Sequence, residues 1–347
     1  FPEAKHLAGG THVEHMADRS AEIFDAIFQG SGELALLKAV EDLRNGRLQN
    51  RYVTSTPCHF RDFSHPRRDF IPTERIVNQE HFKMYGGVAG TGAYFSRGCG
   101  FKCRFCVYNN PPNFEYRDGN QITDEIEYLK RDYGIKGVNL RDEVCIPINR
   151  RHAVKYLEAI GKCGVIWKGQ SVPFGSEDMV VLAAEAGLQE VALGIESVDS
   201  DQVLEISNKP SKSIDNNRRY IELLQKHGIK VKVCLIFGLP GESSRVVDRT
   251  IQFLENVAPD FVALSGFDPV PGSAFYQTPA AYGIRTIEED LSKHTHLIHR
   301  FGDEDDDLGL PFEFEPQGPW GPALSRKQIR DNIKTVQSWL RERNMSY

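Results

Sequence analysis

The sequence predicts an α/β protein built on a partial parallel barrel of six strand-helix units. From position 93 onward, short apolar runs alternate with amphipathic stretches, the pattern of consecutive strand-helix units around a parallel sheet. Three closely spaced cysteines follow the first of these runs, at the carboxyl end of a strand, where parallel barrels place their chemistry. The 347 residues suit one barrel-sized domain with attached pieces.

The barrel elements follow one another in regular order. We expect strands at 93–96, 137–141, 166–172, 191–195, 230–237 and 261–265, with helices at 122–133, 152–162, 176–186, 214–227 and 244–256. A less regular segment completes the sixth unit, and a closing amphipathic helix is expected at 325–343, with Ser325 as its N-cap. The predicted division is 1–50 for an N-terminal unit, 51–92 for a linker, 93–275 for the barrel and 276–347 for a C-terminal extension with a helical piece.

The N-terminal unit is expected to begin with a strand at 4–10, followed by helices at 20–27 and from the 29–33 turn to position 43. Two glycine turns separate these elements, one at Gly9 and Gly10 and one containing Gly30 and Gly32. The pattern resembles the last part of a Rossmann-like domain. The chain starts at Phe1 in mid-pattern and without Met, so we expect it to be part of a longer polypeptide.

Charge and composition narrow the class of protein. The net charge is −6, and the only basic cluster is Arg61, Arg67 and Arg68, so nucleic acid is disfavoured as a partner. No apolar run approaches the roughly 20 residues that span a bilayer, and we expect no membrane association. Seven cysteines fit a reducing cytoplasm better than a disulfide framework. The acidic run 303–307 is expected to be a solvated loop.

Cys99, Cys103 and Cys106 form a C-x3-C-x2-C motif that supplies three thiolates on one short loop. Three ligands leave one iron of a 4Fe-4S cluster open to a small chelating molecule, whereas an electron-carrying ferredoxin closes all four positions. A zinc site would want a fourth Cys or His at short spacing, which His81 and His152 do not provide. Zinc and buried structural thiols remain the alternatives. Cys58, Cys145, Cys163 and Cys234 are not expected to be ligands.

The motif resembles that of the radical S-adenosylmethionine (radical SAM) enzymes. In that family the amino and carboxylate groups of SAM chelate the open iron, and one electron cleaves SAM to a 5′-deoxyadenosyl radical. The resemblance implies a 4Fe-4S cluster, SAM, and an electron donor such as flavodoxin or ferredoxin. It also implies the open six-stranded barrel that the strand-helix pattern predicts.

Further segments resemble the SAM-binding motifs of that family. Phe105 would pack near the adenine, with loop packing as the alternative. Asp142 and Glu143 stand where the family contacts the SAM amino group, and which carboxylate faces SAM is open. Glu196 and Ser197 match a segment that would bind the ribose hydroxyls or the methionyl carboxylate, with a solvated acid as the alternative.

The fifth strand and its turn resemble the adenine-contacting segment of the family. Ile236 and Gly238 would contact the adenine, while Cys234 replaces the usual glycine and Glu242 is displaced by one position. Alternation places Cys234 on the same face as Ile236, in the barrel interior, where its thiol is a candidate hydrogen donor to a substrate radical. A buried cysteine acting as a small hydrophobic side chain is the alternative.

The N-terminal unit resembles the last part of the cobalamin-binding domain that precedes many radical SAM barrels. In that family Gly9, Gly10, Gly30 and Gly32 would let the backbone approach the nucleotide tail of cobalamin, although two ordinary turns explain them equally well. The cobalt-ligating histidine segment of many relatives is absent from this sequence. The turn from Pro269 to Ser273 resembles one common in cobalamin-linked members. Cobalamin binding is therefore left open.

The predicted biochemistry is radical formation from SAM, followed by hydrogen abstraction from a small-molecule substrate. The leading overall reaction is cobalamin-dependent methylation in the biosynthesis of a small metabolite or natural product. The alternatives are a cobalamin-independent dehydration, rearrangement or cyclisation, and an iron-sulfur scaffold or sensor without turnover. A scaffold has no need of a SAM pocket, so the motifs around Glu196 argue against it. No segment of the sequence identifies the substrate.

Overall fold

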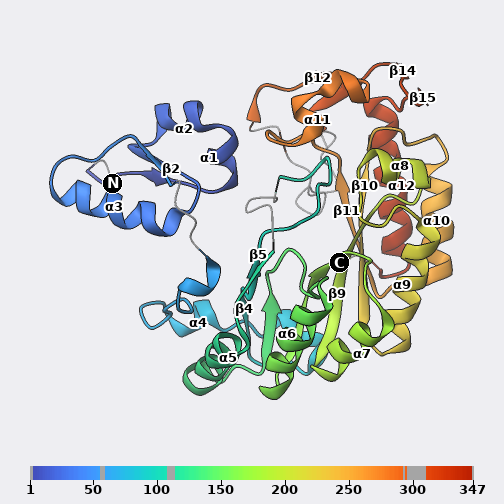
Figure 1. The fold of residues 1–347 in the computed structure, drawn as a ribbon. Helices are drawn as coiled ribbons and strands as arrows, with labels where there is room; N and C mark the ends of the chain where they lie inside the picture. Colours follow the sequence, from blue (N-terminus) through green and yellow to red (C-terminus); the bar gives the residue numbers. More distant parts are fainter. Residues whose placement is uncertain (1–2, 55–58, 108–113, 292–293, 295–309, 346–347) are drawn as a thin grey trace.

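The computed structural model describes residues 3–54, 59–107, 114–291, 294 and 310–345. Cys58 and the acidic run 303–307 lie outside these residues. The central element is a six-stranded sheet in the order β11-β10-β9-β8-β7-β4, in which all neighbours are parallel. Its strands are β4 (Gly90–Ala93), β7 (Gly137–Leu140), β8 (Ile166–Ser171), β9 (Leu188–Glu196), β10 (Lys230–Phe237) and β11 (Phe261–Gly266). The order follows the sequence, and β4 and β11 form the two edges of an open barrel (Figure 1).

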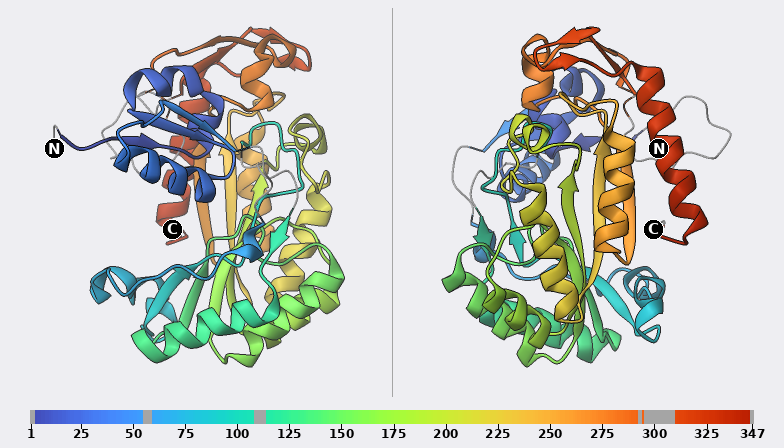
Figure 2. Two further views of the ribbon diagram at one scale, coloured as in Figure 1. Left: turned by 60° about the vertical axis from the view of Figure 1, so that its left-hand side comes forward. Right: turned by 90° about the vertical axis from the view of Figure 1, so that its right-hand side faces the viewer.

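Helices connect the strands and cover the outer face of the sheet (Figures 1 and 2). They are α5 (Gly119–Tyr133), α6 (Arg150–Lys162), α7 (Glu177–Glu185), α8 (Asp201–Ile206), α9 (Ile214–Lys226) and α10 (Val246–Val257). After β11 come α11 (Ala274–Gln277) and, at the end of the chain, α12 (Arg326–Glu342), which packs against α10 and β11. This arrangement confirms the predicted α/β class and six-stranded parallel barrel.

The sheet buries large apolar side chains toward the helices and keeps smaller or polar ones on its inner face. In β10 burial alternates along the strand, so Val231, Val233 and Leu235 are buried against the helices. Cys234 and Ile236 lie on the opposite, inner face, as the alternation predicted. In β9 the same period places Gly194 and Glu196 on the inner face. One face of the sheet therefore makes the core, and the other is left for chemistry.

The N-terminal unit is a small three-stranded parallel sheet, β1-β2-β3, with three helices. Its elements are β1 (Leu7–Ala8), α1 (Thr11–His15), α2 (Ala17–Ile23), β2 (Ala26–Gln29), α3 (Gly32–Arg44) and β3 (Arg51–Val53). The prediction of one helix over 20–27 is wrong, because α2 ends at Ile23 and the apolar run Ala26–Gln29 forms the central strand. The predicted strand at 4–10 is reduced to two residues, and β3 lies in the segment predicted as linker.

The remaining elements connect these two units or close the barrel. Between β3 and β4 lie the 3-10 helix Phe60–Asp62, α4 (Thr73–Ile76) and the 3-10 helix Glu80–Tyr85. The C-terminal extension contains the 3-10 helix Pro279–Tyr282, β12 (Ile284–Ile287) paired with β13 (Phe312–Phe314), and β14 (Gln317–Gly318) paired with β15 (Gly321–Pro322). Ser325 caps α12 as predicted, accepting a hydrogen bond from the amide of Gln328. In the described part of the chain, no helix is long and apolar enough to cross a membrane.

Candidate active site

The three cysteines lie on the loop that follows β4, at the carboxyl end of the parallel strands. The prediction of the first barrel strand at 93–96 is wrong, because the strand spans Gly90–Ala93 and the chain leaves the sheet after Ala93. Ser96 and Arg97 form the short strand β5 (Ser96–Arg97), which pairs antiparallel with β6 (Glu115–Tyr116). Gly98 then turns the chain with φ 79° into the cysteine loop.

The residues that follow α8 hold the cysteine loop in place. The amide of Arg104 donates to the carbonyl oxygen of Ser207 at 2.9 Å, and its guanidinium donates to the carbonyl oxygen of Ile206 at 2.5 Å. The side-chain amide of Asn208 donates to the carbonyl oxygen of Lys102 at 2.7 Å. The cysteine loop is therefore fixed on both sides of Cys103 by a segment about one hundred residues further along the chain.

A buried ion pair links this support to the end of β9. Lys209 donates from Nζ to Oε1 of Glu196 at 2.9 Å, and the two side chains are 3% and 12% exposed. Burial alone would lower the pKa of Lys209, but Glu196, Cys103 and Cys106 together raise it above its ordinary value. The same ammonium lies 5.7 Å from the ring centre of Phe105. Lys209 therefore joins the cysteine loop to the proposed SAM motif.

The backbone of β9 is adapted to present the carboxylate of Glu196. Cys234 of β10 pairs with Gly194, but Leu235 pairs with Glu196, so β9 contains one extra residue at this point. Glu196 has φ 68°, an unusual value for a residue with a side chain. A Cβ at Gly194 would lie only 2.5 Å from Oε1 of Glu196, so the glycine leaves room for this carboxylate in its observed position.

The three cysteines are half-buried. Burial raises the pKa of Cys99, and it raises that of Cys103 to about 11 while the positive charge of Lys209 opposes the shift. Iron binding must therefore displace protons from these thiols, as metal ions commonly do. No group of three or more Cys, His, Asp or Glu side chains among the described residues is arranged to hold a single metal ion. Each cysteine of a 4Fe-4S cluster binds a different iron, so such ligands need not converge on one point.

Asp142 and Glu143 have different surroundings, although they are adjacent. Asp142 is fully buried and accepts hydrogen bonds from the Phe95 amide at 2.8 Å and from the hydroxyls of Ser96 and Tyr156, each at 2.7 Å. These donors occupy the Asp142 carboxylate, so the expectation that it contacts SAM is not supported. Glu143 lines a cavity inside the barrel, and its buried Oε2 has no hydrogen-bond partner. Burial raises the pKa of Glu143, and the charge of Asp142 raises it further.

The ends of β9 and β10 are tied together by Ser197 and Glu242. The hydroxyl of Ser197 donates to Oε1 of Glu242 at 2.9 Å, and the amide of Gly238 donates to Oε2 at 2.7 Å. Burial raises the pKa of Glu242 to about 8. Gly238 has φ 91° and packs against Ile329, so its glycine is required by the turn itself. The structure thus gives Ser197 and Gly238 roles in holding the site together.

Other predicted site residues are brought to the same end of the barrel. Cys234 and Ile236 lie on the inner face of β10, and Cys234 pairs with Gly194 directly below Glu196. Burial raises the pKa of the Cys234 thiol to about 11, so it is neutral at ordinary pH. A neutral thiol is the form that can donate a hydrogen atom, and this role stays a prediction.

The glycines of the N-terminal unit follow the carboxyl ends of β1 and β2. Gly10 has φ 87° and Gly30 has φ 80°, and the space around the Cα atoms of Gly10 and Gly32 is open. Gly9 packs against Phe28, while a Cβ at Gly30 would meet the carbonyl oxygen of Thr54 at 2.7 Å. This edge of a parallel sheet is where such folds bind nucleotide groups. Two of the four glycines therefore leave room for a ligand, and the other two are explained by packing.

The N-terminal unit is also linked directly to the cysteine loop. Arg97, two residues before Cys99, binds Glu33 of α3 at 2.6 Å and Glu115 at 2.7 Å. This connection was not predicted. Asn208 and Lys209 were also missed, although Asn-Lys-Pro after an apolar stretch is a recognisable signal for the end of a helix.

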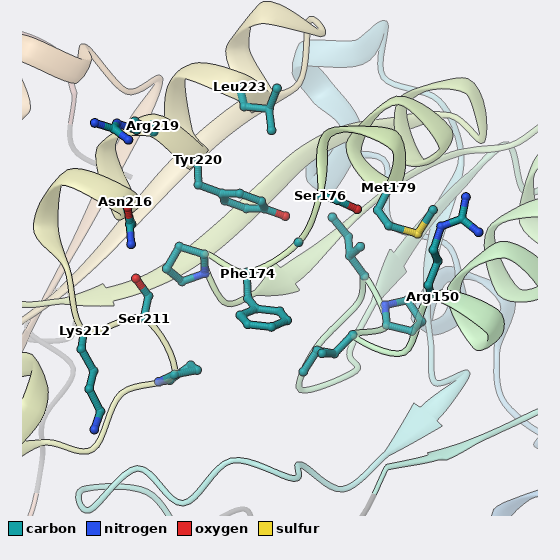
Figure 3. A pocket seen from close by; sticks show the side chains of 16 residues that line it. Arg150, Phe174, Ser176, Met179, Ser211, Lys212, Asn216, Arg219, Tyr220 and Leu223 are labelled. Atoms are coloured by element: carbon teal, nitrogen blue, oxygen red, sulfur yellow. The ribbon is translucent and has the colours of Figure 1, made fainter.

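A separate cavity of about 700 Å³ lies beside the cysteine loop, between the segments that follow β7, β8 and α8 (Figure 3). Phe174 lies at its centre, with Arg150 and Lys212 on opposite sides in Figure 3. The ring of Phe174 contacts that of Phe101, which lies between Cys99 and Cys103, at 6.4 Å between ring centres. The part of the cavity lined by Phe174 therefore lies next to the cysteine loop.

Comparison with known proteins agrees with this geometry. The family model of the radical SAM superfamily matches residues 93–254. The matched stretch is most of the barrel and just under half of the chain, so residues 93–254 are similar to a radical SAM domain.

Two curated relatives and one solved structure illustrate what the chain is similar to. Bacteriochlorophyllide d C-12(1)-methyltransferase of Chlorobaculum tepidum is 25% identical over 78% of this chain and 59% of its own length. Anaerobic magnesium-protoporphyrin IX monomethyl ester cyclase of Rubrivivax gelatinosus is 27% identical over 80% of this chain and 53% of its own length. The radical SAM methyltransferase TsrM of Kitasatospora setae, solved with cobalamin and a [4Fe-4S] cluster, shares the fold with a TM-score of 0.62. Its sequence identity is 18%, over 82% of this chain and 59% of that one. The chain spans less than two thirds of the length of each of these proteins.

Proposed function

We propose that this chain is the catalytic part of a radical SAM enzyme that abstracts hydrogen from a small-molecule substrate. The observation that carries the proposal is the position of the cysteine loop, which is clamped at the carboxyl end of an open parallel barrel and linked by Lys209 to Glu196. Cys99, Cys103 and Cys106 would hold a 4Fe-4S cluster. When bound, the cluster supplies the electron that cleaves SAM to a 5′-deoxyadenosyl radical.

The residues of the chain bind and orient the cofactor. Glu143 is the better candidate for the SAM ammonium, because its buried Oε2 has no hydrogen-bond partner while the Asp142 oxygens are occupied. Glu196 is held at the barrel mouth by Lys209 and is proposed to accept from the ribose hydroxyls. Phe105, beside Lys209, and Ile236, on the inner face of β10, are proposed to pack against the adenine.

For the overall reaction we propose cobalamin-dependent methylation. The open space at Gly10 and Gly32, at the carboxyl edge of the small sheet, supports a cobalamin contact there. When bound, cobalamin would supply the methyl group. Similarity to a methyltransferase and to the cobalamin-containing TsrM supports the same reaction. A cobalamin-independent ring closure is the second candidate, because a cyclase is among the relatives.

The proposed reaction needs a one-electron donor, such as flavodoxin or ferredoxin. The cavity beside the cysteine loop is lined by the exposed ring of Phe174 and by basic residues, including Lys212. These features suit a small acidic protein that delivers an electron close to Cys103. The thiols that bind iron must stay reduced, so we propose that the enzyme works in the cytoplasm.

Anaerobic reconstitution with iron, sulfide, SAM and dithionite tests this function. We expect iron and sulfide in the amounts of one 4Fe-4S cluster, together with 5′-deoxyadenosine detected by mass spectrometry. Replacing Cys99, Cys103 and Cys106 with Ala should abolish both, whereas Cys163→Ala, a buried cysteine on the outer side of the barrel, should leave both unchanged. A triple variant that retains its cluster would refute the assignment. Stoichiometric uptake of hydroxocobalamin, and methylated product, would favour methylation over ring closure.

A further inference from the structure

The inner face of the barrel forms a second cavity, of about 430 Å³, which includes Glu143 in its lining and extends below Glu196 and Ile236. Ala192 in its lining precedes Gly194 and Glu196 on the inner face of β9, and Lys232 precedes Cys234 and Ile236 on β10. Each step of two residues along a strand is about 6.6 Å, so Ala192 and Lys232 lie one layer inward from the proposed cofactor residues of β9 and β10. Its volume suits part of a small molecule.

Charged side chains dominate this lining. Three cations, Arg141, Lys168 and Lys232, and two carboxylates, Glu143 and Glu190, face the cavity. Lys168 and Glu190 are nearly buried, with side chains 9% and 6% exposed, and their charged atoms are 3.7 Å apart. Glu190 also accepts a hydrogen bond from the hydroxyl of Tyr85 at 3.1 Å. The formal charges of these five side chains sum to +1.

One of two lowered pKa values reports the same excess of positive charge. Burial lowers the pKa of Lys232, and Arg141 lowers it further, while Cys234 and Glu190 oppose the shift. His81, on the 3-10 helix Glu80–Tyr85, also has a lowered pKa, first because of burial and then because of Arg141 and Lys168. Buried cations that disfavour one another are stabilised when an anion joins them.

We propose that this cavity binds a carboxylate group of the substrate, through Arg141, Lys168 and Lys232. The inference rests on the proposed function for the identity of the bound molecule as substrate. A single carboxylate neutralises the excess charge of the lining, and the Arg141 guanidinium offers the paired donors that carboxylates accept. Bound there, the carboxylate would fix one end of the substrate inside the barrel, while the rest of the molecule extends toward the cofactor layer. The substrate class is therefore a small organic acid.

The test uses two matched probes, benzoate and its neutral isostere benzamide, with direct binding measured by calorimetry on the whole chain. We expect benzoate to bind and benzamide to bind at least tenfold more weakly. Lys232→Met and Lys168→Met should each weaken benzoate binding by roughly tenfold to a hundredfold, the effect of losing a hydrogen bond to a charged group. Lys226→Met, on the outer surface of α9, is the matched control and should leave benzoate affinity unchanged.

Thermal unfolding of each variant, measured without benzoate or benzamide, checks that the variant folds. A Lys168→Arg variant keeps the positive charge and should retain most of the benzoate affinity. Equal binding of the two probes, absence of benzoate binding, or unchanged affinity in both Lys→Met variants would overturn the inference. None of these measurements uses iron or SAM. Failure of the carboxylate site is thus distinguishable from failure of the proposed function, which shows as absent cluster or absent 5′-deoxyadenosine.

Discussion

Lys209 and Glu196 form a buried ion pair that connects the support of the cysteine loop to the mouth of the barrel. The partners come from the segment after α8 and from the end of β9, and each is held there by a distorted backbone. Asn208, before Lys209, has φ 52°, and Glu196 itself has φ 68°. Backbone values of this kind persist where surrounding contacts impose them, and they cluster at functional sites.

Removing one partner of this ion pair should lower the stability of the folded chain. Lys209→Met leaves the Glu196 carboxylate buried without its cation, and we expect a loss of about 3–5 kcal/mol in the free energy of unfolding. The double variant Lys209→Met/Glu196→Gln should recover part of that loss, since no charge remains uncompensated. Urea unfolding of the iron-free chain measures both, with the exposed Lys212→Met as control. If Lys209→Met is as stable as the control variant, the ion pair does not contribute to the stability of the fold.

Glu143 and Asp142 should respond differently to the loss of a charge. Glu143→Gln is expected to weaken SAM binding roughly tenfold to a hundredfold without changing iron content, because it removes a charge-assisted hydrogen bond to the ligand. Asp142→Asn should instead lower stability by about 1–3 kcal/mol, because an amide cannot accept from all three donors at once.

Equilibrium binding of SAM to the reconstituted protein, together with urea unfolding, separates the two effects. If Glu143→Gln binds SAM as tightly as the parent while Asp142→Asn does not, the assignment of the two carboxylates has to be reversed.

The stability of the chain should depend on pH through Glu242. Its folded-state pKa of about 8 lies above its ordinary value of 4.5, so the folded chain retains a proton that the unfolded chain releases. The contribution of this proton is complete below pH 4.5 and is lost as the pH rises through about 8. A pKa change of one corresponds to about 1.4 kcal/mol, so Glu242 contributes at most a few kcal/mol to the pH dependence of the free energy of unfolding.

Glu242→Gln imitates the protonated carboxyl and should flatten this decline. Melting temperatures of the iron-free chain between pH 5 and pH 8.5 check the prediction, with the exposed Glu74→Gln as control. We expect the difference between Glu242→Gln and the parent chain to grow in favour of the variant as the pH rises. A constant difference across this range would contradict the raised pKa.

Local sequence patterns, namely strand alternation and the spacing of the cysteines, predicted much of this site. Alternation alone placed Cys234 and Ile236 on the inner face of the barrel, because successive side chains of a strand point to opposite faces. The cysteine spacing located the loop, since its three cysteines are close together in sequence. The strand at 230–237 was predicted with its observed bounds.

Features that depend on distant contacts were not predictable in the same way. Lys209 pairs with a residue 13 positions away, and Arg104 binds carbonyl groups about one hundred positions away, so no local pattern marks either contact. Adjacent carboxylates such as Asp142 and Glu143 cannot be told apart until the fold buries one of them. The short central strand Ala26–Gln29 reads equally well as the end of a helix, because an apolar run of that length has no distinguishing period.

Charge at the rim of the cavity beside the cysteine loop should affect electron delivery by a protein donor alone. With an acidic flavodoxin as the donor, Lys212→Glu is expected to slow formation of 5′-deoxyadenosine severalfold, because like charges reduce the rate of encounter. With dithionite as the donor, the rate should match that of the parent. Higher salt should shrink the difference between variant and parent. A variant that is equally slow with both donors would place the defect in the enzyme itself and not in docking.

Gly194 should be intolerant of even one methyl group. A Cβ at this position would lie 2.5 Å from Oε1 of Glu196 and 3.4 Å from Nζ of Lys209, so Gly194→Ala must displace the carboxylate from its place at the barrel mouth. We expect SAM affinity to fall at least tenfold while the cluster content stays at that of the parent, because the cysteine loop keeps its contacts with Asn208 and Ser207. Gly119→Ala is the matched control, since a Cβ there makes ordinary contact with Ala159 at 3.5 Å. Iron analysis and SAM binding are measured on both variants. A Gly194→Ala protein with the SAM affinity of the parent would show that Glu196 does not need its observed position to bind the cofactor.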